Sequence, residues 1–177
     1  MTPSAPSAAG LGPLAAPDRV AALALRGLPA ALTLAGRVAL HERVNAMPVM
    51  RHLAARLDLT DAVATRVVLD RVQPFHLGGL ERPALNGGVI AAMLDGAMVA
   101  AGMAQFPGRH CGTVDLAIKL LRPVFTGRAE AVGIVLRRTL NLAFVAAELY
   151  DDGDRLCATA SGIIAAPGRS SEEGGSP

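Results

Sequence analysis

The stretch from residue 83 to 104, PALNGGVIAAMLDGAMVAAGMA, is almost wholly apolar, yet it carries one carboxylate, Asp95, and opens on Asn86-Gly87-Gly88. The first turn of a helix has unpaired backbone N–H groups and the positive end of the helix dipole. Glycine in that turn lets another group approach the backbone without obstruction. Amide donors for an oxyanion, together with a carboxylate base or nucleophile, are what hydrolysis at a carbonyl carbon requires. Gly87, Gly88 and Asp95 are therefore candidate catalytic groups.

The spacing of these groups bears on how many chains form the site. Eight residues separate Gly87 from Asp95, which corresponds to about 12 Å along a helix, whereas both groups must lie within roughly 3 Å of the reacting atoms. Two antiparallel helices related by a two-fold axis place Gly87 of one subunit beside Asp95 of the other. If this is the site, we expect an obligate dimer with two equivalent sites.

Two of these residues also have a purely structural interpretation. A lone Asp in an apolar helix can be a structural acid that is hydrogen-bonded to N–H groups of a neighbouring chain. Asn86 is a favoured N-cap residue and needs no chemistry to explain it. We interpret Asn86 as the cap that sets the helix start, and the spacing from Gly87 favours a functional role for Asp95.

The elements that would position these groups follow from hydrophobic periodicity. Residues 62–72 alternate like a strand, a loop rich in Gly and Pro follows, and the apolar helix runs from Gly87 to about Ala104. Alternation then predicts four strands, at 113–121, 128–138, 142–150 and 155–165. In the first of these the expected buried face carries Val114, Leu116, Ile118 and Leu120, and the opposite face carries Thr113, Asp115 and Lys119. The Asp-Gly pair at 152–153 indicates a hairpin turn and lacks the spacing of a calcium loop.

A helix that is apolar on nearly every side must be covered on several sides, so we expect an α+β fold with a curved antiparallel sheet around it. Residues 45–166 would form this domain. Residues 17–44 predict a helical extension of two helices with a break near Pro29, and a third helix is expected from Pro48 to about Leu57. The loop-like composition of residues 1–16 and 167–177 predicts disorder.

Composition excludes several classes of protein. The net charge is only +2 and aromatic residues make up 3% of the chain, which gives little basis for nucleic-acid binding. Charged residues interrupt the apolar stretch from Val20 to Val44, and no signal peptide is recognisable, so we expect a cytoplasmic protein without membrane association. Cys111 and Cys157 have no metal-binding spacing, and we expect no metal ion.

The segments NGGVIAAMLD and TVDLAIKLLRPV resemble the hotdog-fold thioesterases of the PaaI type, which are related to 4-hydroxybenzoyl-CoA thioesterase. The resemblance covers roughly residues 45–166. It implies the hotdog fold, hydrolysis of an acyl-CoA thioester without a cofactor, and a dimer that often pairs again into a tetramer. It places the family's nucleophile or general base at Asp95 and the amide that polarises the carbonyl at Gly87. Asn86 stands where many members have His, and only His76 matches the upstream residue that helps to place substrate or water.

Coenzyme A also needs cations for its phosphates. Arg137 and Arg138 are adjacent on a predicted strand and point to opposite faces, so at most one of them is expected to face a given ligand. Arg122 lies earlier in the chain, at the turn that leads into this strand. We take these three arginines, with Thr113, as candidate CoA-binding residues, and an acyl-carrier protein remains the alternative donor of the acyl group.

Other functions of the same fold stay open at this stage. A non-catalytic module that binds acyl-CoA would be expected to lack the helix acid, and a hotdog hydratase or dehydratase would need a histidine that this helix lacks. Met93, Met98, Met103 and Phe75 could line an acyl pocket, although core packing explains them equally well. The extension could either cover the acyl tunnel or enlarge the subunit interface.

Overall fold

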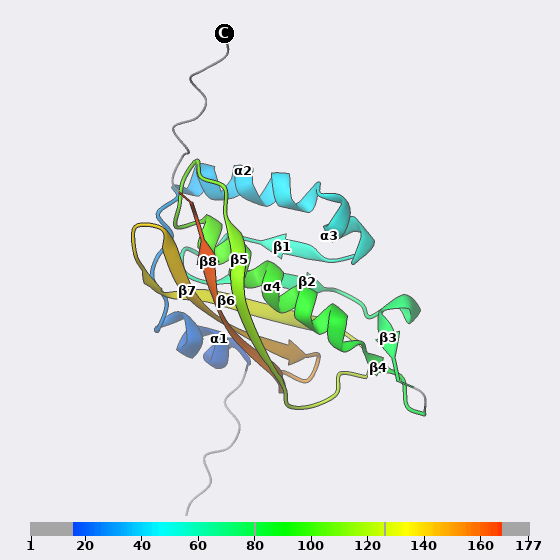
Figure 1. Ribbon diagram of the computed structural model, residues 1–177. Helices are drawn as coiled ribbons and strands as arrows, with labels where there is room; N and C mark the ends of the chain where they lie inside the picture. The colour runs from blue at the N-terminus through cyan, green and yellow to red at the C-terminus, as the bar shows by residue number, and fades with distance from the viewer. Residues whose placement is uncertain (1–15, 80, 126, 168–177) are drawn as a thin grey trace, which may run out of the picture.

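The computed structural model describes residues 16–79, 81–125 and 127–167 (Figure 1). The segments with predicted disorder, 1–16 and 167–177, fall almost entirely outside the described residues. In chain order the elements are α1 (Ala16–Ala24), α2 (Leu34–Asn45), α3 (Pro48–His52), β1 (Arg56–Asp58), β2 (Thr65–Leu69), a 3-10 turn η1 (Pro74–His76), β3 (Leu77–Gly78), β4 (Ala84–Leu85), α4 (Gly87–Met103), β5 (Gly112–Leu120), β6 (Ala129–Arg138), β7 (Leu142–Asp151) and β8 (Leu156–Ala165).

An antiparallel sheet of six strands curves around the long helix α4. The strand order is β1-β2-β6-β7-β8-β5, and α4 packs against five of these strands, β2, β5, β6, β7 and β8. The side chains of Met93, Leu94, Ala97 and Met98 are fully buried between the helix and the sheet. The predicted α+β architecture is confirmed, and Met93 and Met98 belong to its core.

Close contact between α4 and the sheet depends on small residues. A Cβ atom added to Gly133 of β6 would lie 2.6 Å from the carbonyl of Ala97, and one added to Gly102 would lie 2.7 Å from the side chain of Ile164. The hydroxyl of Thr65 donates a 2.6 Å hydrogen bond to the Ala97 carbonyl oxygen, on the same stretch of helix. The helix is therefore held at a distance that larger side chains could not accommodate.

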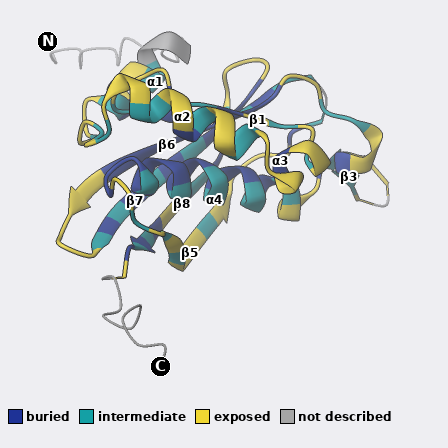
Figure 2. Cartoon of the chain, turned by 90° about the horizontal axis from the view of Figure 1, so that it is seen from above, coloured by how far each residue is buried: buried dark blue, intermediate teal, exposed yellow. Residues whose placement is uncertain are grey.

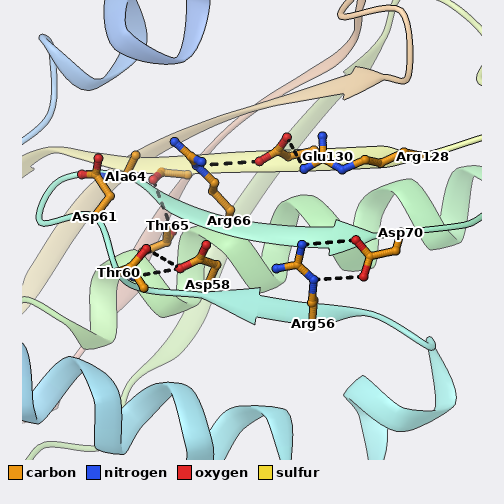
Figure 3. A network of polar contacts seen from close by, with 11 residues as sticks. Arg56, Asp58, Thr60, Asp61, Ala64, Thr65, Arg66, Asp70, Arg128 and Glu130 are labelled. Carbon is orange, nitrogen blue, oxygen red and sulfur yellow. Dashed lines mark hydrogen bonds and ion pairs between the residues drawn. The ribbon is translucent and has the colours of Figure 1, made fainter. Parts of the chain in front are cut away.

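The region between residues 48 and 58 differs from the sequence-based prediction. The helix α3 ends at His52, and Ala54 adopts a positive φ of 47°, which stops the helical path. The chain then forms β1, which pairs with β2 at the edge of the sheet and is joined to it by the ion pair of Arg56 and Asp70 (Figure 3). The predicted helix is wrong beyond residue 52, because pairing with β2 outweighs a weak local helical pattern.

The N-terminal helices cover two different parts of the domain. Leu23 of α1 is 4% exposed and packs with Ile134 and Tyr150 on the outer face of the sheet. Helix α2 lies along β1 and is mostly exposed, whereas α4 and the central strands contain most of the buried residues (Figure 2). Among the described residues, no helix is long and apolar enough to cross a membrane.

The strand β5 forms one edge of the sheet and is exposed over most of its length. Val114, Leu116 and Leu120 are 63%, 38% and 59% exposed, so the predicted burial of this face does not hold within one chain. A β-bulge between Thr113 and Asp115 also shifts the alternation, with the result that Thr113 faces α4. An edge strand with exposed apolar side chains is a common site of pairing with another chain.

Candidate active site

The first turn of α4 is fixed by bonds from the residue that precedes it. The side-chain oxygen of Asn86 accepts a 2.8 Å hydrogen bond from the Gly88 N–H, and the backbone N–H of Asn86 donates to the His76 carbonyl oxygen at 2.8 Å. Asn86 is thus the N-cap, as its residue type predicts. Within the described part of the chain, neither the Gly87 N–H nor the Val89 N–H has an acceptor, and Gly87 is the more exposed of the two, so its amide is available to an added ligand.

Gly87 is exposed and lies at an open position. A Cβ atom added there would meet only the Leu120 side chain, at an ordinary contact distance of 3.5 Å, and the residue does not have a positive φ. Neither backbone conformation nor internal packing therefore requires glycine. The remaining effect of glycine is to leave the approach to its own N–H unobstructed.

Asp95 lies two turns further along α4 and is half-buried. The Thr113 hydroxyl donates a 2.6 Å hydrogen bond to its Oδ1 atom, and no donor in the described residues faces Oδ2. Thr113 therefore fixes the orientation of the carboxylate and leaves one oxygen for a water molecule or a substrate carbon. The sequence pattern predicts Thr113 as a candidate CoA contact and does not pair it with Asp95, because the bulge that turns it toward the helix has no clear sequence signal.

Within one chain, the Gly87 amide and the Asp95 carboxylate do not meet. They stand on the same helix at positions separated by about 12 Å along its axis. A carbonyl group held by the Gly87 N–H would be out of reach of the same chain's Asp95.

His76 is 1% exposed and is fully engaged with the backbone. Its Nδ1 atom accepts a 2.9 Å hydrogen bond from the Gln73 N–H, and its Nε2 atom lies 2.8 Å from the Leu53 carbonyl oxygen, to which it donates. The ring thereby fixes the turn before β3. In this geometry His76 acts on the helix start through its carbonyl oxygen, which holds Asn86.

The predicted CoA-binding arginines lie at opposite ends of the domain. Arg122 follows β5, close to the start of α4, and lines a cavity of about 420 Å³ with Arg82, Phe125 and Arg155. Arg138 lies at the other end of α4, where it donates to the Gln105 carbonyl oxygen at 2.8 Å, and Arg137 is its neighbour on β6. Arg82 and Arg155 were not predicted, because they come from separate loops that only the folded chain brings together.

One of the three arginines in this cavity already has a partner. Arg155 forms a 2.6 Å ion pair with Asp151. Burial disfavours the charge of Asp151, but the hydrogen bonds from Arg155 and from backbone amides outweigh it and lower the pKa of the carboxyl group. Arg82 lies over the Phe125 ring, 3.8 Å from its centre, so Arg82 and Arg122 are the cations that an added anion could meet.

The cysteines show no catalytic arrangement. Burial raises the pKa of the Cys157 thiol to about 11 and also raises the pKa of Cys111. In the described part of the chain, no group of three or more His, Cys, Asp or Glu side chains could hold a metal ion.

A curved antiparallel sheet around one central helix, with glycines at the start of that helix, defines a hotdog-fold protein. Residues 83–158 match the profile of the thioesterase superfamily. The chain therefore has the hotdog fold, and its central segment is similar to the thioesterase superfamily.

Solved structures agree with this fold. The Escherichia coli PaaI protein from the phenylacetic acid degradation operon has a TM-score of 0.66 and 19% identity, over 77% of this chain and 97% of its own. A thioesterase-related protein of Shewanella oneidensis has a TM-score of 0.67 and 20% identity, over 74% and 97%. A phenylacetic acid degradation-related protein of Ralstonia eutropha is 26% identical over 67% and 90%, with a TM-score of 0.55. The search of curated proteins found no match.

Proposed function

We propose that the protein is an acyl-CoA thioesterase, which hydrolyses a thioester to a free acid and coenzyme A. Two groups on α4 carry this proposal. The Gly87 N–H at the helix start has no hydrogen-bond acceptor among the described residues, and the Asp95 carboxylate accepts a hydrogen bond from Thr113 on one oxygen and none on the other. The 26% identity to the Ralstonia eutropha protein supports the same class of reaction.

The reaction follows from these two groups. The Gly87 N–H, aided by the helix dipole, polarises the thioester carbonyl and stabilises the oxyanion. In the general-base route, Asp95 takes a proton from a water molecule that adds to the carbonyl carbon. The C–S bond then breaks, and the CoA thiolate leaves and recovers that proton. In the nucleophilic route, Asp95 attacks the carbon itself, CoA leaves, and water hydrolyses the resulting anhydride. Both routes use the same geometry.

Each site would be shared by two subunits. Because about 12 Å separates the groups within α4, Gly87 of one chain would act with Asp95 of a two-fold partner. The exposed edge strand β5 carries Thr113 and apolar side chains, and it offers the surface on which such a partner would pair. We therefore propose a homodimer as the active unit, with a tetramer as a further assembly.

The phosphates of coenzyme A would bind at Arg122 and Arg82. These arginines lie beyond the end of β5, whose Leu120 side chain is next to Gly87, so they are at the end of the domain where the thioester would be held. Arg137 and Arg138 of the same chain lie at the far end of α4, and in an antiparallel dimer the partner's copies would approach this end. An acyl-carrier protein would present its phosphopantetheine arm to the same arginines.

The test is thiol release from a panel of acyl-CoAs by the wild type and by Asp95→Asn, compared at equal dimer content. We expect turnover to fall at least about a hundredfold in Asp95→Asn, because amide oxygen is a poor base and nucleophile. Asp70→Asn is the matched control, since this carboxylate is exposed at the end of β2, where it pairs with Arg56 and is not one of the groups on α4 (Figure 3). Acyl-CoA binding without turnover by the wild type would instead indicate a binding module.

A further inference from the structure

A second cavity, of about 600 Å³, lies between α2 and the C-terminal end of α4. Its apolar lining comes from the extension on one side and from the end of α4 with the following loop on the other: Leu32, Leu40, Val44, Met47, Met103 and Phe106. The volume is within the range of small-molecule sites, roughly 300 to 1,000 Å³. One wall belongs to the N-terminal extension, which precedes the segment matched to the superfamily profile.

Hydrogen bonds attach the wall formed by the extension to the rest of the domain. The Leu32 N–H donates to the Ala104 carbonyl oxygen at 3.0 Å, at the end of α4. At the other end of α2, the Asn45 side chain makes two hydrogen bonds with the backbone of Leu57, of 2.7 and 3.0 Å. The cavity is therefore part of the folded chain, because both ends of α2 are anchored to other elements.

The cavity adjoins the C-terminal end of the α4 face that carries Asp95, because Met103 belongs to both. Asp95, Val99 and Met103 follow one another at four-residue spacing, so they form one stripe, and all three are half-buried. On the neighbouring strand, Thr113 bonds Asp95, and Cys111, two residues earlier, lines the cavity. The path from Asp95 to Met103 is about 12 Å long.

The cavity suits an uncharged aliphatic group. Among the polar residues of its lining, Arg109 already has hydrogen-bond partners. Its guanidinium donates to the Leu140 carbonyl oxygen and to the Asn141 side chain, each at 2.7 Å. Arg43 and His110 are exposed at the rim. An extended alkyl chain advances about 1.2 Å per bond, so roughly ten bonds are needed to reach Met103 from Asp95. The ring of a phenylacetyl or hydroxybenzoyl group would stop short of it.

We propose that this cavity receives the distal end of a straight-chain acyl group of about twelve or more carbons, whose thioester carbon lies at Asp95. The inference rests on the proposed thioesterase function and names its substrate class. Helix α2 thus serves as the outer wall of an acyl-binding chamber.

A chain-length series tests the proposal through turnover. Ala39 is exposed on α2 and lines the cavity, whereas Val38 is exposed outside the lining, so Ala39→Trp would fill the cavity and Val38→Trp is the matched control. We expect Ala39→Trp to lower kcat/KM for myristoyl-CoA by about tenfold or more and to leave butyryl-CoA within about twofold, with no such change in Val38→Trp. Equal loss for both chain lengths, or a wild-type preference for phenylacetyl-CoA over myristoyl-CoA, would overturn the proposal.

A binding measurement separates this inference from the catalytic one. Cys111 is half-exposed in the cavity lining and Cys157 is buried, so iodoacetamide labelling followed by mass spectrometry reports on the cavity. In Asp95→Asn, we expect myristoyl-CoA to slow the labelling of Cys111, and CoA and butyryl-CoA to leave it unchanged. Protection by myristoyl-CoA without any wild-type turnover would support the chamber and refute the thioesterase. Equal protection by CoA alone would show that the cavity holds the CoA arm, and turnover of myristoyl-CoA without protection would refute the chamber.

Discussion

At the scale of single residues, the candidate site depends on two groups prepared by their neighbours. Among the described residues, Asn86 accepts a hydrogen bond from the Gly88 N–H beside the unbonded Gly87 N–H, while Thr113 donates to one oxygen of Asp95 and leaves the other. Asn86 fixes the start of the helix, and Thr113 fixes the orientation of the Asp95 carboxylate. The geometry thus accounts for why Asn86 and Thr113 belong beside the site without touching the reacting atoms.

Gly87→Ala tests whether access to this amide matters. The added methyl group would meet only Leu120 at 3.5 Å, and Ala favours the helix by up to about 1 kcal/mol relative to Gly, so the fold should be unchanged or slightly more stable. We expect kcat to fall about tenfold or more, because the methyl group lies where the carbonyl must approach. Steady-state kinetics and chemical denaturation on the same sample check both parts. Unchanged kcat in a correctly folded variant would rule Gly87 out as the oxyanion donor.

At the scale of elements, the position of α4 against the sheet is set by glycines and by one buried hydroxyl. Gly133 on β6 faces the Ala97 carbonyl, and Thr65 of β2 donates to the same oxygen. These contacts fix the height of the helix over the strands. The distance between α4 and β5, and with it the bond from Thr113 to Asp95, depends on that height.

Gly133→Ala should therefore weaken the domain as a whole. Its Cβ atom would lie 2.6 Å from backbone atoms of Ala97, which cannot move without displacing α4. We expect a loss of about 1 to 3 kcal/mol in the free energy of unfolding, measured by urea denaturation. Gly96→Ala is the control, because its Cβ atom would meet Val67 at an ordinary 3.5 Å and the helix would gain propensity. Equal stability of the two variants would contradict the close packing.

At the scale of the whole molecule, one chain carries both candidate groups, Gly87 and Asp95, at positions where they cannot act on the same carbonyl. The Gly87 end of α4 is adjacent to the cavity of Arg82 and Arg122, and the Asp95 face leads to the cavity under α2. A two-fold partner on the exposed edge of β5 would bring one group from each chain together. The dimer would thus be needed for chemistry, and exposed residues such as Val114 would become part of its interface.

Complementation between two inactive variants tests the shared site. Asp95→Asn and Gly87→Val should each lack activity as homodimers, but a mixed dimer would keep one intact site, made of Gly87 from the first variant and Asp95 from the second. Random pairing on co-expression predicts about a quarter of wild-type activity in the mixture and about half in the purified mixed dimer. Affinity purification with two different tags and a thiol-release assay would measure it. No recovery in a verified mixed dimer would place both groups in one subunit.

The sequence by itself determined the central helix, its capped start at Asn86, the strands after it and the Gly87-to-Asp95 spacing, because these follow from local periodicity and residue type. Its failures lie where distant segments compete or meet. The strand β1 replaced a predicted helix end because β2 pairs with it, and the bulge in β5 turned Thr113 toward Asp95. The arginine-lined cavity and the cavity under α2 exist only because loops and helices far apart in the chain pack together. Such long-range packing leaves no periodic signal in the sequence, so only the tertiary structure decided it.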